Sequence, residues 1–547
     1  MTPWTTTGQV ARRAAVLVAA SLAILAFVPR AETAGRYSTA DEPLWMRRTQ
    51  QFGDAILRRD FAAASATTGQ QATMPGVTTM WIGNATRALS WVAVRYGLAA
   101  PSQQPFAVSP QALHGAQLGV AVTTSALVGV IAFLAWQWAG PVAAITAGAL
   151  LASEPFLVAH GAAFHTDALT GLFGAAGVLA MLLAFGIPEP RVDRRRGLAA
   201  AGGALLGCAL LTKLSALPLL LGVAALLAGV LFHGARRVHG RPLGAEPRVA
   251  VRLLATAALG FVAALLTWPA IWADPVHQIR FLLDTAELAL TPHQTFFLGH
   301  ITGTPGPLFY AVALPLRMTP WFLLGVLALL PLALMRDKRW HVLSLIAIAA
   351  VPVAVLSCAA KQMDRYAVVV LPLVALAVGL GADVAVRSAR ARLGARWRWL
   401  PAAGAPAVAL AVAHAVWVAP WGLAYFNPLL GGSRVAERAV IIGWGEGLEI
   451  AGEQIRRREA PRCDVKIALK YHAIRSAFPC GTTIPDLKAA DYVVLYISQR
   501  QRLPEQDVAD IRRRGHLVGT VSIRDINYAE VYDMRPGSNA ALDGFGG

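Results

Sequence analysis

The sequence is poor in charged residues. Of its 547 residues only 15% are charged, 56% are hydrophobic, and the mean hydropathy is +0.51. Soluble domains carry about a quarter charged residues, so most of this chain must face lipid rather than water. Four cysteines in this length also exclude a small disulfide scaffold, and the composition is neither that of a disordered nor of a collagen-like chain.

Acidic residues are scarcer than basic ones. Asp and Glu total 31 against 49 Lys and Arg, which gives a net charge of +18. The excess is arginine, with 43 Arg and six Lys, and much of it lies in short loops between apolar runs, as the positive-inside rule describes. We find no basic face with interleaved aromatic residues, so we expect no nucleic-acid partner.

Long apolar runs dominate the chain. Crossing a bilayer takes about 20 residues. Eleven runs qualify as spans: 12–29, 112–138, 141–158, 168–187, 198–213, 214–232, 253–272, 308–334, 341–357, 366–386 and 400–420. With the N-terminus inside, this count puts every short arginine cluster on one side of the membrane, whereas ten spans would split them. The least distinct boundary lies near Lys213, and the alternative for the first run is a cleaved signal peptide.

These features predict a multi-span α-helical protein of the plasma (inner) membrane with a small extracytoplasmic α/β domain. We place the membrane domain at 1–420 and the C-terminal domain at 421–547. Within the membrane domain, residues 30–110 form a first outer loop with amphipathic helices over 43–60 and 76–96. In the C-terminal domain, β-branched runs predict strands at 465–469, 492–497 and 517–523, and helical patterns cover 434–458 and 504–514.

The cysteines divide by location. Cys463 and Cys480 lie in the C-terminal domain, where an oxidising exterior favours a disulfide between them, the alternative being two buried free thiols. Cys208 and Cys358 lie in or near membrane spans, where we expect them to be packing residues.

The pair Asp41-Glu42 follows the first span by about a dozen residues, near the outer membrane face. One reading is a helix N-cap, because Ser38 to Pro43 is a good helix start with acid at its positive end. The other reading is a general base, since a partly desolvated carboxylate beside arginines can take the proton of an acceptor hydroxyl. The two readings are compatible.

Four further titratable residues share one short outer turn. They are Glu154, His160, His165 and Asp167. Such a cluster makes a divalent metal a possible cofactor, although no fixed ligand spacing is present. The plain alternative for Asp167 is again a helix cap.

Lys361 and Arg365 lie in a short outer loop, against the positive-inside trend. If the loop is helical, both cations share one face, and an anionic phosphate at the outer leaflet would explain them. Alternatively Asp364 only pairs with Arg365. The segments 293–300, which includes His300, and 304–310 are either the lining of a sugar pocket or ordinary loop and aromatic-belt residues.

The unusual polar residues therefore lie at the outer ends of spans. A proton- or ion-coupled transporter carries charges or broken helices near the bilayer midplane. Lys213 is the clear exception, and it too lies at a span end. This distribution favours chemistry at the outer surface over transport.

In their order along residues 12–450, these motifs resemble the type C glycosyltransferases, most closely the bacterial branch related to protein O-mannosyltransferases and the lipid A aminoarabinose transferase. The strings that carry the resemblance are Asp41-Glu42-Pro43-Leu44-Trp45, Pro75-Gly76-Val77-Thr78-Thr79-Met80-Trp81, Glu154-Pro155-Phe156, His165-Thr166-Asp167, Asp364-Arg365-Tyr366, Tyr425-Phe426-Asn427-Pro428 and Gly443-Trp444-Gly445-Glu446-Gly447. One departure is Met74, where the family pattern leads us to expect His.

The resemblance implies an inverting transfer of a hexose or pentose from a polyprenyl-phosphate donor to a protein, glycan or lipid acceptor. The Ala- and Arg-rich, Lys-poor composition is typical of a GC-rich bacterial genome, so we expect undecaprenyl or decaprenyl phosphate as the carrier. The resemblance also implies that Asp41 is the general base, with Glu42 next to it. Lys361 and Arg365, with Tyr366, would hold the donor phosphate, and membrane lipid would surround the protein. The residues that would line the site are Glu154, His165, Asp167 and His300. The competing interpretations are a lipid or polysaccharide transporter and a non-catalytic assembly subunit.

Overall fold

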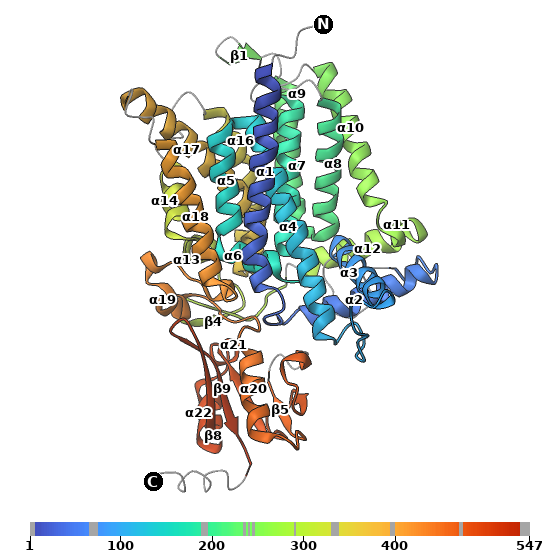
Figure 1. Cartoon of the computed structure of the whole chain (residues 1–547), viewed down its shortest axis with the longest axis vertical. Coiled ribbons are helices and arrows are strands. Elements are labelled where there is room, and N and C mark those ends of the chain that lie inside the picture. The colour runs from blue at the N-terminus through green and yellow to red at the C-terminus, as the bar shows by residue number, and fades with distance from the viewer. Residues whose placement is uncertain are drawn as a thin grey trace.

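The structure, a computed structural model, describes residues 6–64, 75–187, 195–233, 237–238, 241–242, 247–288, 291–329, 339–393, 400–469 and 474–535. Its long helices stand side by side in a bundle, and a small domain built on a sheet lies beyond one end of that bundle (Figure 1). The first helix, α1 (Thr6–Thr33), begins at the opposite end and runs toward the sheet domain.

Six of the described helices are long and apolar enough to cross a membrane. They are α1, α4 (Pro110–Ala139), α7 (Asp167–Phe185), α10 (Pro247–Leu265), α16 (Arg339–Cys358) and α17 (Leu371–Leu393). Two bent pairs raise the count to eight. The helices α5 (Pro141–Ser153) and α6 (Pro155–Ala162) meet at 64°, and α18 (Leu400–Val418) meets the segment 422–430 at 97°.

The multi-span helical class is thus confirmed, and the count of eleven is approximate. Within the described residues, which leave out 330–334, each of the eleven predicted runs lies on a helix or on two consecutive ones. The runs around Lys213 are α8 (Arg195–Thr212) and α9 (Leu217–His233), and the chain reverses between them, so they are separate helices (Figure 1). The run 308–334 is broken into α13 (Phe309–Arg317) and α14 (Pro320–Leu327), since a proline cannot continue the hydrogen-bond ladder of the preceding helix.

Small residues let the bundle helices approach closely. A Cβ atom on Gly203 of α8 would lie 1.9 Å from the carbonyl oxygen of Ala257 in α10, and one on Gly260 would lie 2.1 Å from that of Ala200. Such backbone contact supplies the van der Waals packing that holds helices together in lipid, where burial of apolar surface gives little driving force. Of the six long apolar helices α7 lies deepest, with 94% of its most apolar 18 residues buried.

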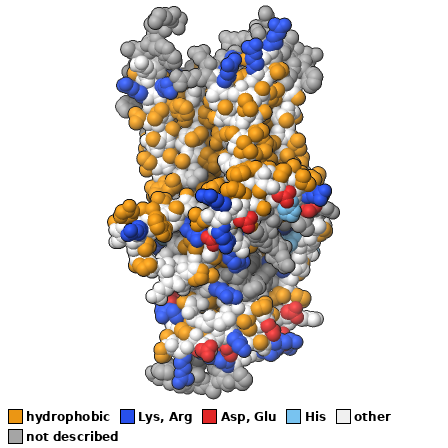
Figure 2. All heavy atoms as spheres, turned by 90° about the vertical axis from the view of Figure 1, so that its right-hand side faces the viewer, with side chains coloured by type: hydrophobic (Ala, Val, Ile, Leu, Met, Phe, Trp, Pro, Cys, Tyr) orange, Lys and Arg blue, Asp and Glu red, His pale blue; other side chains and the backbone are white. Residues whose placement is uncertain are grey.

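The segment after α1 forms two helices near the sheet end of the bundle, α2 (Glu42–Leu57) and α3 (Val77–Arg95). Both agree with the amphipathic helices predicted for 43–60 and 76–96. α2 buries Trp45, Met46 and Phe52 on its inner face. In Figure 2 the bundle surface is largely apolar with Lys and Arg at its far end, whereas acids and bases mix at and below the level of these helices.

A five-stranded sheet forms the centre of the C-terminal domain. Its strand order is β6 (Thr482–Ile484), β5 (Lys466–Ala468), β7 (Tyr492–Tyr496), β9 (Ile526–Asp533) and β8 (His516–Ile523). β5 pairs in parallel with β6 and β7, and β9 pairs antiparallel with β7 and β8. The helices α20 (Leu448–Glu459) and α22 (Glu505–Arg514) pack beside it. The three predicted strands are β5, β7 and β8, while β6 and β9 had not been predicted.

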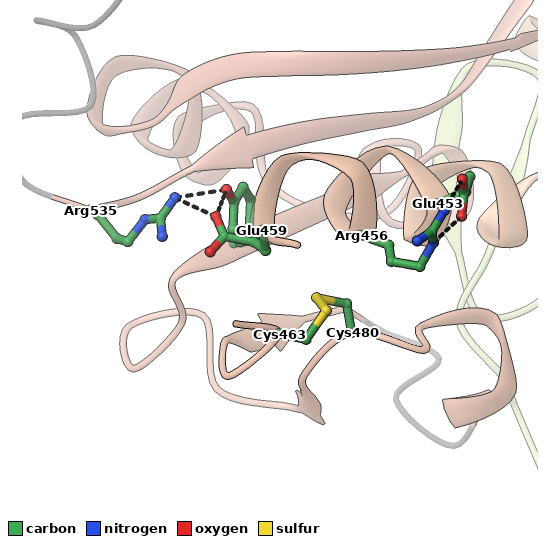
Figure 3. Close-up of a disulfide and its surroundings, with 7 residues drawn as sticks. Glu453, Arg456, Glu459, Cys463, Cys480 and Arg535 are labelled. Atoms are coloured by element: carbon green, nitrogen blue, oxygen red, sulfur yellow. Dashed lines mark hydrogen bonds and ion pairs between the residues drawn. A yellow bond between two sulfur atoms is a disulfide. The ribbon is translucent and has the colours of Figure 1, made fainter. Parts of the chain in front are cut away.

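A disulfide joins Cys463 and Cys480 (Figure 3). The two residues precede β5 and β6, so the bond fastens the starts of two parallel neighbours. Nearby, α20 carries a surface ion pair between Arg456 and Glu453 at 2.6 Å. Among the described cysteines, Cys208 and Cys358 are free.

We predict that replacing both bridged cysteines by serine lowers the free energy of unfolding of the C-terminal domain. A closed loop of this size restricts the unfolded chain enough to contribute about 3 kcal/mol. Peptide mapping without reduction should find Cys463 linked to Cys480, and thermal melting should detect the loss of stability. The matched control is Cys358→Ser, an exposed free thiol that should leave the melting curve unchanged. Equal melting of all three proteins would contradict the prediction.

Candidate functional site

Asp41 lies between α1 and α2, at the position that precedes the first helical residue. Its side chain makes no capping hydrogen bond to α2. Instead its Oδ2 atom lies 3.2 Å from Nη2 of Arg365 and 3.5 Å from Nε2 of His165. The side chain remains 34% exposed. The carboxylate is therefore held by cationic partners while one part of it stays accessible.

Glu42, the neighbouring candidate, is fully buried, and both of its carboxylate oxygens accept hydrogen bonds. Its oxygens accept hydrogen bonds from the backbone N–H of Thr39 at 2.6 Å, from that of Phe164 at 2.6 Å and from the Gln117 side chain at 2.9 Å. Glu42 thus fixes the turn that presents Asp41.

A second carboxylate closes the charge network from the side of the bundle. Asp167, the first residue of α7, accepts a hydrogen bond from Nζ of Lys213. Its other oxygen lies 3.1 Å from Nδ1 of His165 and 4.0 Å from Nε of Arg365. His165 therefore bridges Asp41 and Asp167, and Arg365 faces both acids. We call Asp41, His165, Asp167, Lys213 and Arg365 the charge cluster.

The cluster sets the protonation of its members. Partial burial alone would raise the pKa of Asp41, but Arg365 and His165 bring it well below its usual value. Burial would lower the pKa of His165, whereas Asp167 and Asp41 raise it above normal. The pKa of Arg365 is likewise raised by Asp41 against the effect of burial. Asp41 is thus an anion and His165 and Arg365 are favoured as cations.

The exposed part of Asp41 faces a cavity of about 460 Å³ between the bundle and the C-terminal domain. Arg365 lines the same cavity, and its guanidinium lies 4.4 Å from the centre of the Trp444 ring. The other lining residues are Ala40, Phe156, His160, His293, Gln294, Thr295, Arg317, Met363, Asp364, Leu423, Ile441, Gly443, Glu446 and Arg502.

Arg317 has a structural partner. Its Nη2 atom lies 2.6 Å from Oδ2 of Asp364, and its guanidinium lies between the rings of Phe156 and Phe426, 4.6 and 4.1 Å from their centres. The alternative in which Asp364 only pairs with Arg365 is therefore wrong, because the Asp364 carboxylate forms its ion pair with Arg317. Because Asp364 pairs with Arg317, the Arg365 guanidinium forms its short ion pair with Asp41.

Lys361 and Arg365 do not share a helical face, which corrects the prediction. Residues 359–363 are not helical, and the short helix η2 (Asp364–Val369) begins only at Asp364. Lys361 is nevertheless close enough to Arg365 to feel its charge. Burial lowers the pKa of Lys361 most, and the charge of Arg365 lowers it further. Tyr366 lies beside the cluster, with its ring centre 4.5 Å from Nζ of Lys213.

Two of the expected lining residues lie elsewhere. Glu154 is buried at the bend between α5 and α6, where it accepts hydrogen bonds from the backbone N–H and hydroxyl of Thr319, the residue before α14. His300 is exposed on the hairpin of β3 (Thr295–Phe297) and β4 (His300–Thr302), and does not line the cavity. The same segment reaches the cavity through His293 instead. Met74 lies outside the described residues.

The sequence reasoning missed Arg317, Trp444 and the partner of Lys213. Arg317 had a detectable signal: it interrupts the apolar run 308–334, and a charge in such a run needs a partner. Trp444 was noted only as part of a resemblance. The Lys213–Asp167 contact joins positions 46 residues apart, and no local pattern connects them.

A metal does not fit the cluster. In the described part of the chain, no three His, Cys, Asp or Glu side chains are placed to hold a metal ion. Arg365 and His165 lie between the two carboxylates, and Lys213 contacts Asp167 from its other oxygen. The positive charge that a metal would supply is already present.

We predict that Lys213→Met lowers the thermal stability of the protein in detergent. The change leaves Asp167 buried without its closest cation, which costs about 3 kcal/mol. Adding Asp167→Asn should restore much of the loss, because the uncompensated charge is gone. As a control, Arg36→Met removes an exposed pair with Glu32 and should change little. Losses that simply add in the double variant would show that the two residues are not coupled.

No protein-family model matches the chain, and no curated protein matches it in sequence. Among solved structures, ArnT from Cupriavidus metallidurans bound to undecaprenyl phosphate is similar over 97% of this chain and 99% of its own, with 14% identity and a TM-score of 0.53. Its apo state matches over 95% and 97%, with 15% identity and a TM-score of 0.53. The oligosaccharyltransferase AglB from Archaeoglobus fulgidus matches at 10% identity over 98% of this chain and 75% of its own, with a TM-score of 0.46. The chain therefore has the fold of ArnT, as the resemblance to the type C glycosyltransferases implied.

Proposed function

We propose that the protein is a membrane glycosyltransferase that moves a sugar from a polyprenyl-phosphate carrier to an acceptor hydroxyl, with inversion. The observation that carries this proposal is the pair of Asp41 and Arg365, a carboxylate and a guanidinium 3.2 Å apart that face one cavity at the end of the bundle. ArnT, which has this fold, was solved with undecaprenyl phosphate.

Arg365 and Lys361 are the proposed donor site. A polyprenyl-phosphate sugar carries one negative charge, and the departing phosphate gains more as its bond to the sugar breaks. Fixed cations at that position stabilise the charge that develops in the transition state. The planar fork of Arg365 suits two phosphate oxygens at once.

Asp41 is the proposed base. Its carboxylate accepts the proton of the acceptor hydroxyl while the hydroxyl oxygen attacks the anomeric carbon from the face opposite the phosphate. Beside Arg365 alone, Asp41 has a low pKa and is a weak base. When the donor phosphate shares Arg365, the carboxylate loses part of this stabilisation and its pKa rises. Donor binding would thus strengthen the base at the moment it is needed.

We place the cavity and the C-terminal domain on the outer side of the plasma membrane. Lys and Arg side chains gather at the opposite end of the bundle, where the positive-inside rule puts the cytoplasm (Figure 2). A lipid-linked donor suits this side of the membrane, because transfer from such a donor requires no nucleotide sugar. The charge cluster also lies at helix ends rather than at mid-bundle, which disfavours the transporter alternative.

We predict that Asp41→Asn keeps the fold and lowers turnover by about 100-fold or more, the usual contribution of a general base. The assay is release of polyprenyl phosphate from a purified lipid-linked sugar in the presence of a membrane acceptor extract. Asp54→Asn, which changes an acid of α2 that pairs with Arg87 away from the cavity, is the matched control and should retain normal turnover. Near-normal turnover in Asp41→Asn would remove Asp41 from the mechanism.

We predict that Arg365→Ala weakens use of the donor by roughly 10- to 150-fold, the effect of losing a charge-assisted hydrogen bond worth about 1.5–3 kcal/mol. Arg365→Lys keeps the charge but loses the fork, so it should fall between Arg365→Ala and the wild type. The measurement is transfer rate against donor concentration for the three proteins. An unchanged donor dependence in Arg365→Ala would place the phosphate elsewhere.

A further inference from the structure

The cavity is closed on one side by a loop that belongs to neither the membrane helices nor the sheet. Residues 443–447 connect the region after α19 (Gly432–Ala439) to α20, and we call them the glycine loop. Gly443, Gly445 and Gly447 all have positive φ, at 90°, 129° and 82°. This backbone path is open to glycine and brings the loop against the segment that carries Asp41.

Direct contacts join the glycine loop to that segment. The carbonyl oxygen of Trp444 accepts a hydrogen bond from the backbone N–H of Ala40 at 2.7 Å, immediately before Asp41. A Cβ atom on Gly445 would lie 2.4 Å from the carbonyl oxygen of Ser38. Trp444 is therefore hydrogen-bonded to the backbone next to the proposed base, and Gly445 packs against the same segment.

The side chain of Trp444 contacts two members of the charge cluster, Arg365 and His165. Its ring centre lies 4.4 Å from the Arg365 guanidinium and 4.9 Å from the centre of the His165 ring, to which it is nearly perpendicular. A cation over an indole face is held in place by the ring quadrupole. Trp444 thus contacts the residue before Asp41 through its backbone, and Arg365 and His165 through its ring.

The hydroxyl of one residue of the C-terminal sheet, Tyr496, is hydrogen-bonded to the glycine loop. Tyr496, the last residue of β7, is fully buried, and its OH accepts a hydrogen bond from the Gly445 backbone at 3.0 Å. The same OH lies 3.0 Å from both the carbonyl and the carboxylate of Glu446, to which it can donate. The Glu446 carboxylate in turn accepts from the Trp444 backbone. A continuous chain of contacts runs from the sheet to Asp41.

We propose that the C-terminal domain is a working part of the transfer site, in which Tyr496 positions the glycine loop and Trp444 positions Arg365 and Asp41. This inference rests on the proposed function. Neither Tyr496 nor the loop backbone needs to touch the substrate, so both are positioning residues. The domain holds the base and the phosphate-binding cation at their working separation.

The test compares Tyr496→Phe with Tyr528→Phe. Tyr528 is equally buried in the adjacent strand β9, but its hydroxyl has no hydrogen-bond partner among the described residues. Each change removes one buried hydroxyl from the same sheet, and only one disturbs the loop. The readouts are thermal stability and the pH profile of kcat/KM, with the lipid-linked sugar isolated from cells that lack the protein as donor.

We expect Tyr496→Phe to lower kcat/KM by about 10-fold, as for loss of a buried hydrogen-bonding group, and to move its acid limb to higher pH. The sign follows from Arg365: when it sits less closely to Asp41, the carboxyl holds its proton to higher pH and the base is lost earlier on acidification. Tyr528→Phe should keep both the rate and the acid limb of the wild type.

A lower rate in Tyr496→Phe with an unmoved acid limb would overturn the inference, because a purely structural defect reduces the amount of active protein without changing its titration. Equal behaviour of the two variants would overturn it as well. If Tyr496→Phe does not fold, Trp444→Leu makes the same test from outside the sheet, with Trp444→Phe expected to recover part of the loss. Failure of the proposed function is distinguished by Asp41→Asn, which would then turn over normally.

Discussion

The ion pair between Asp41 and Arg365 is the constraint that the rest of the structure serves. The two residues are 324 positions apart, so their contact requires that α1 and the chain before α17 end at one level of the bundle. His165 and Asp167 at the start of α7, and Lys213 just after α8, complete the cluster. Because so many charges meet where water is scarce, each needs an opposite neighbour, and the arrangement can hold its charges only when all the helices are in place.

Such a balanced cluster also has a chemical consequence. A carboxylate that is stabilised by a guanidinium rests as an anion, and an anionic ligand that competes for the guanidinium changes the basicity of that carboxylate. In the proposed mechanism, donor binding and proton transfer are linked by one side chain, Arg365. Trp444 packs on Arg365 and is connected through Glu446 to Tyr496 of the C-terminal sheet. The C-terminal domain is thereby in contact with the charge cluster.

Much of the fold followed from the sequence because its causes are local. Apolar runs, arginine-rich loops and the amphipathic spacing of α2 and α3 are readable within short windows, as are three of the five strands. The short strand β6 and the long strand β9 were missed. The breaks at Pro155 and Pro320 made the span count approximate, since a bent pair and a single span have the same composition.

The site was predicted less completely, because its contacts join residues distant in sequence. Asp41, His165, Asp167 and Arg365 were singled out from their positions at span ends, and they do meet. The ion pair of Arg317 with Asp364 and the hydrogen bond of Lys213 to Asp167 depend on which helices are neighbours. The helical face expected for Lys361 and the lining role expected for His300 failed for a related reason: a loop and a hairpin turn set their directions.

The proposed transfer itself is tested most directly in cells that lack the protein, by mass spectrometry of their polyprenyl-phosphate lipids. The account predicts that an intact lipid-linked sugar accumulates and that wild-type protein, but not Asp41→Asn, removes it. A lipid pool unchanged by loss of the protein would contradict it.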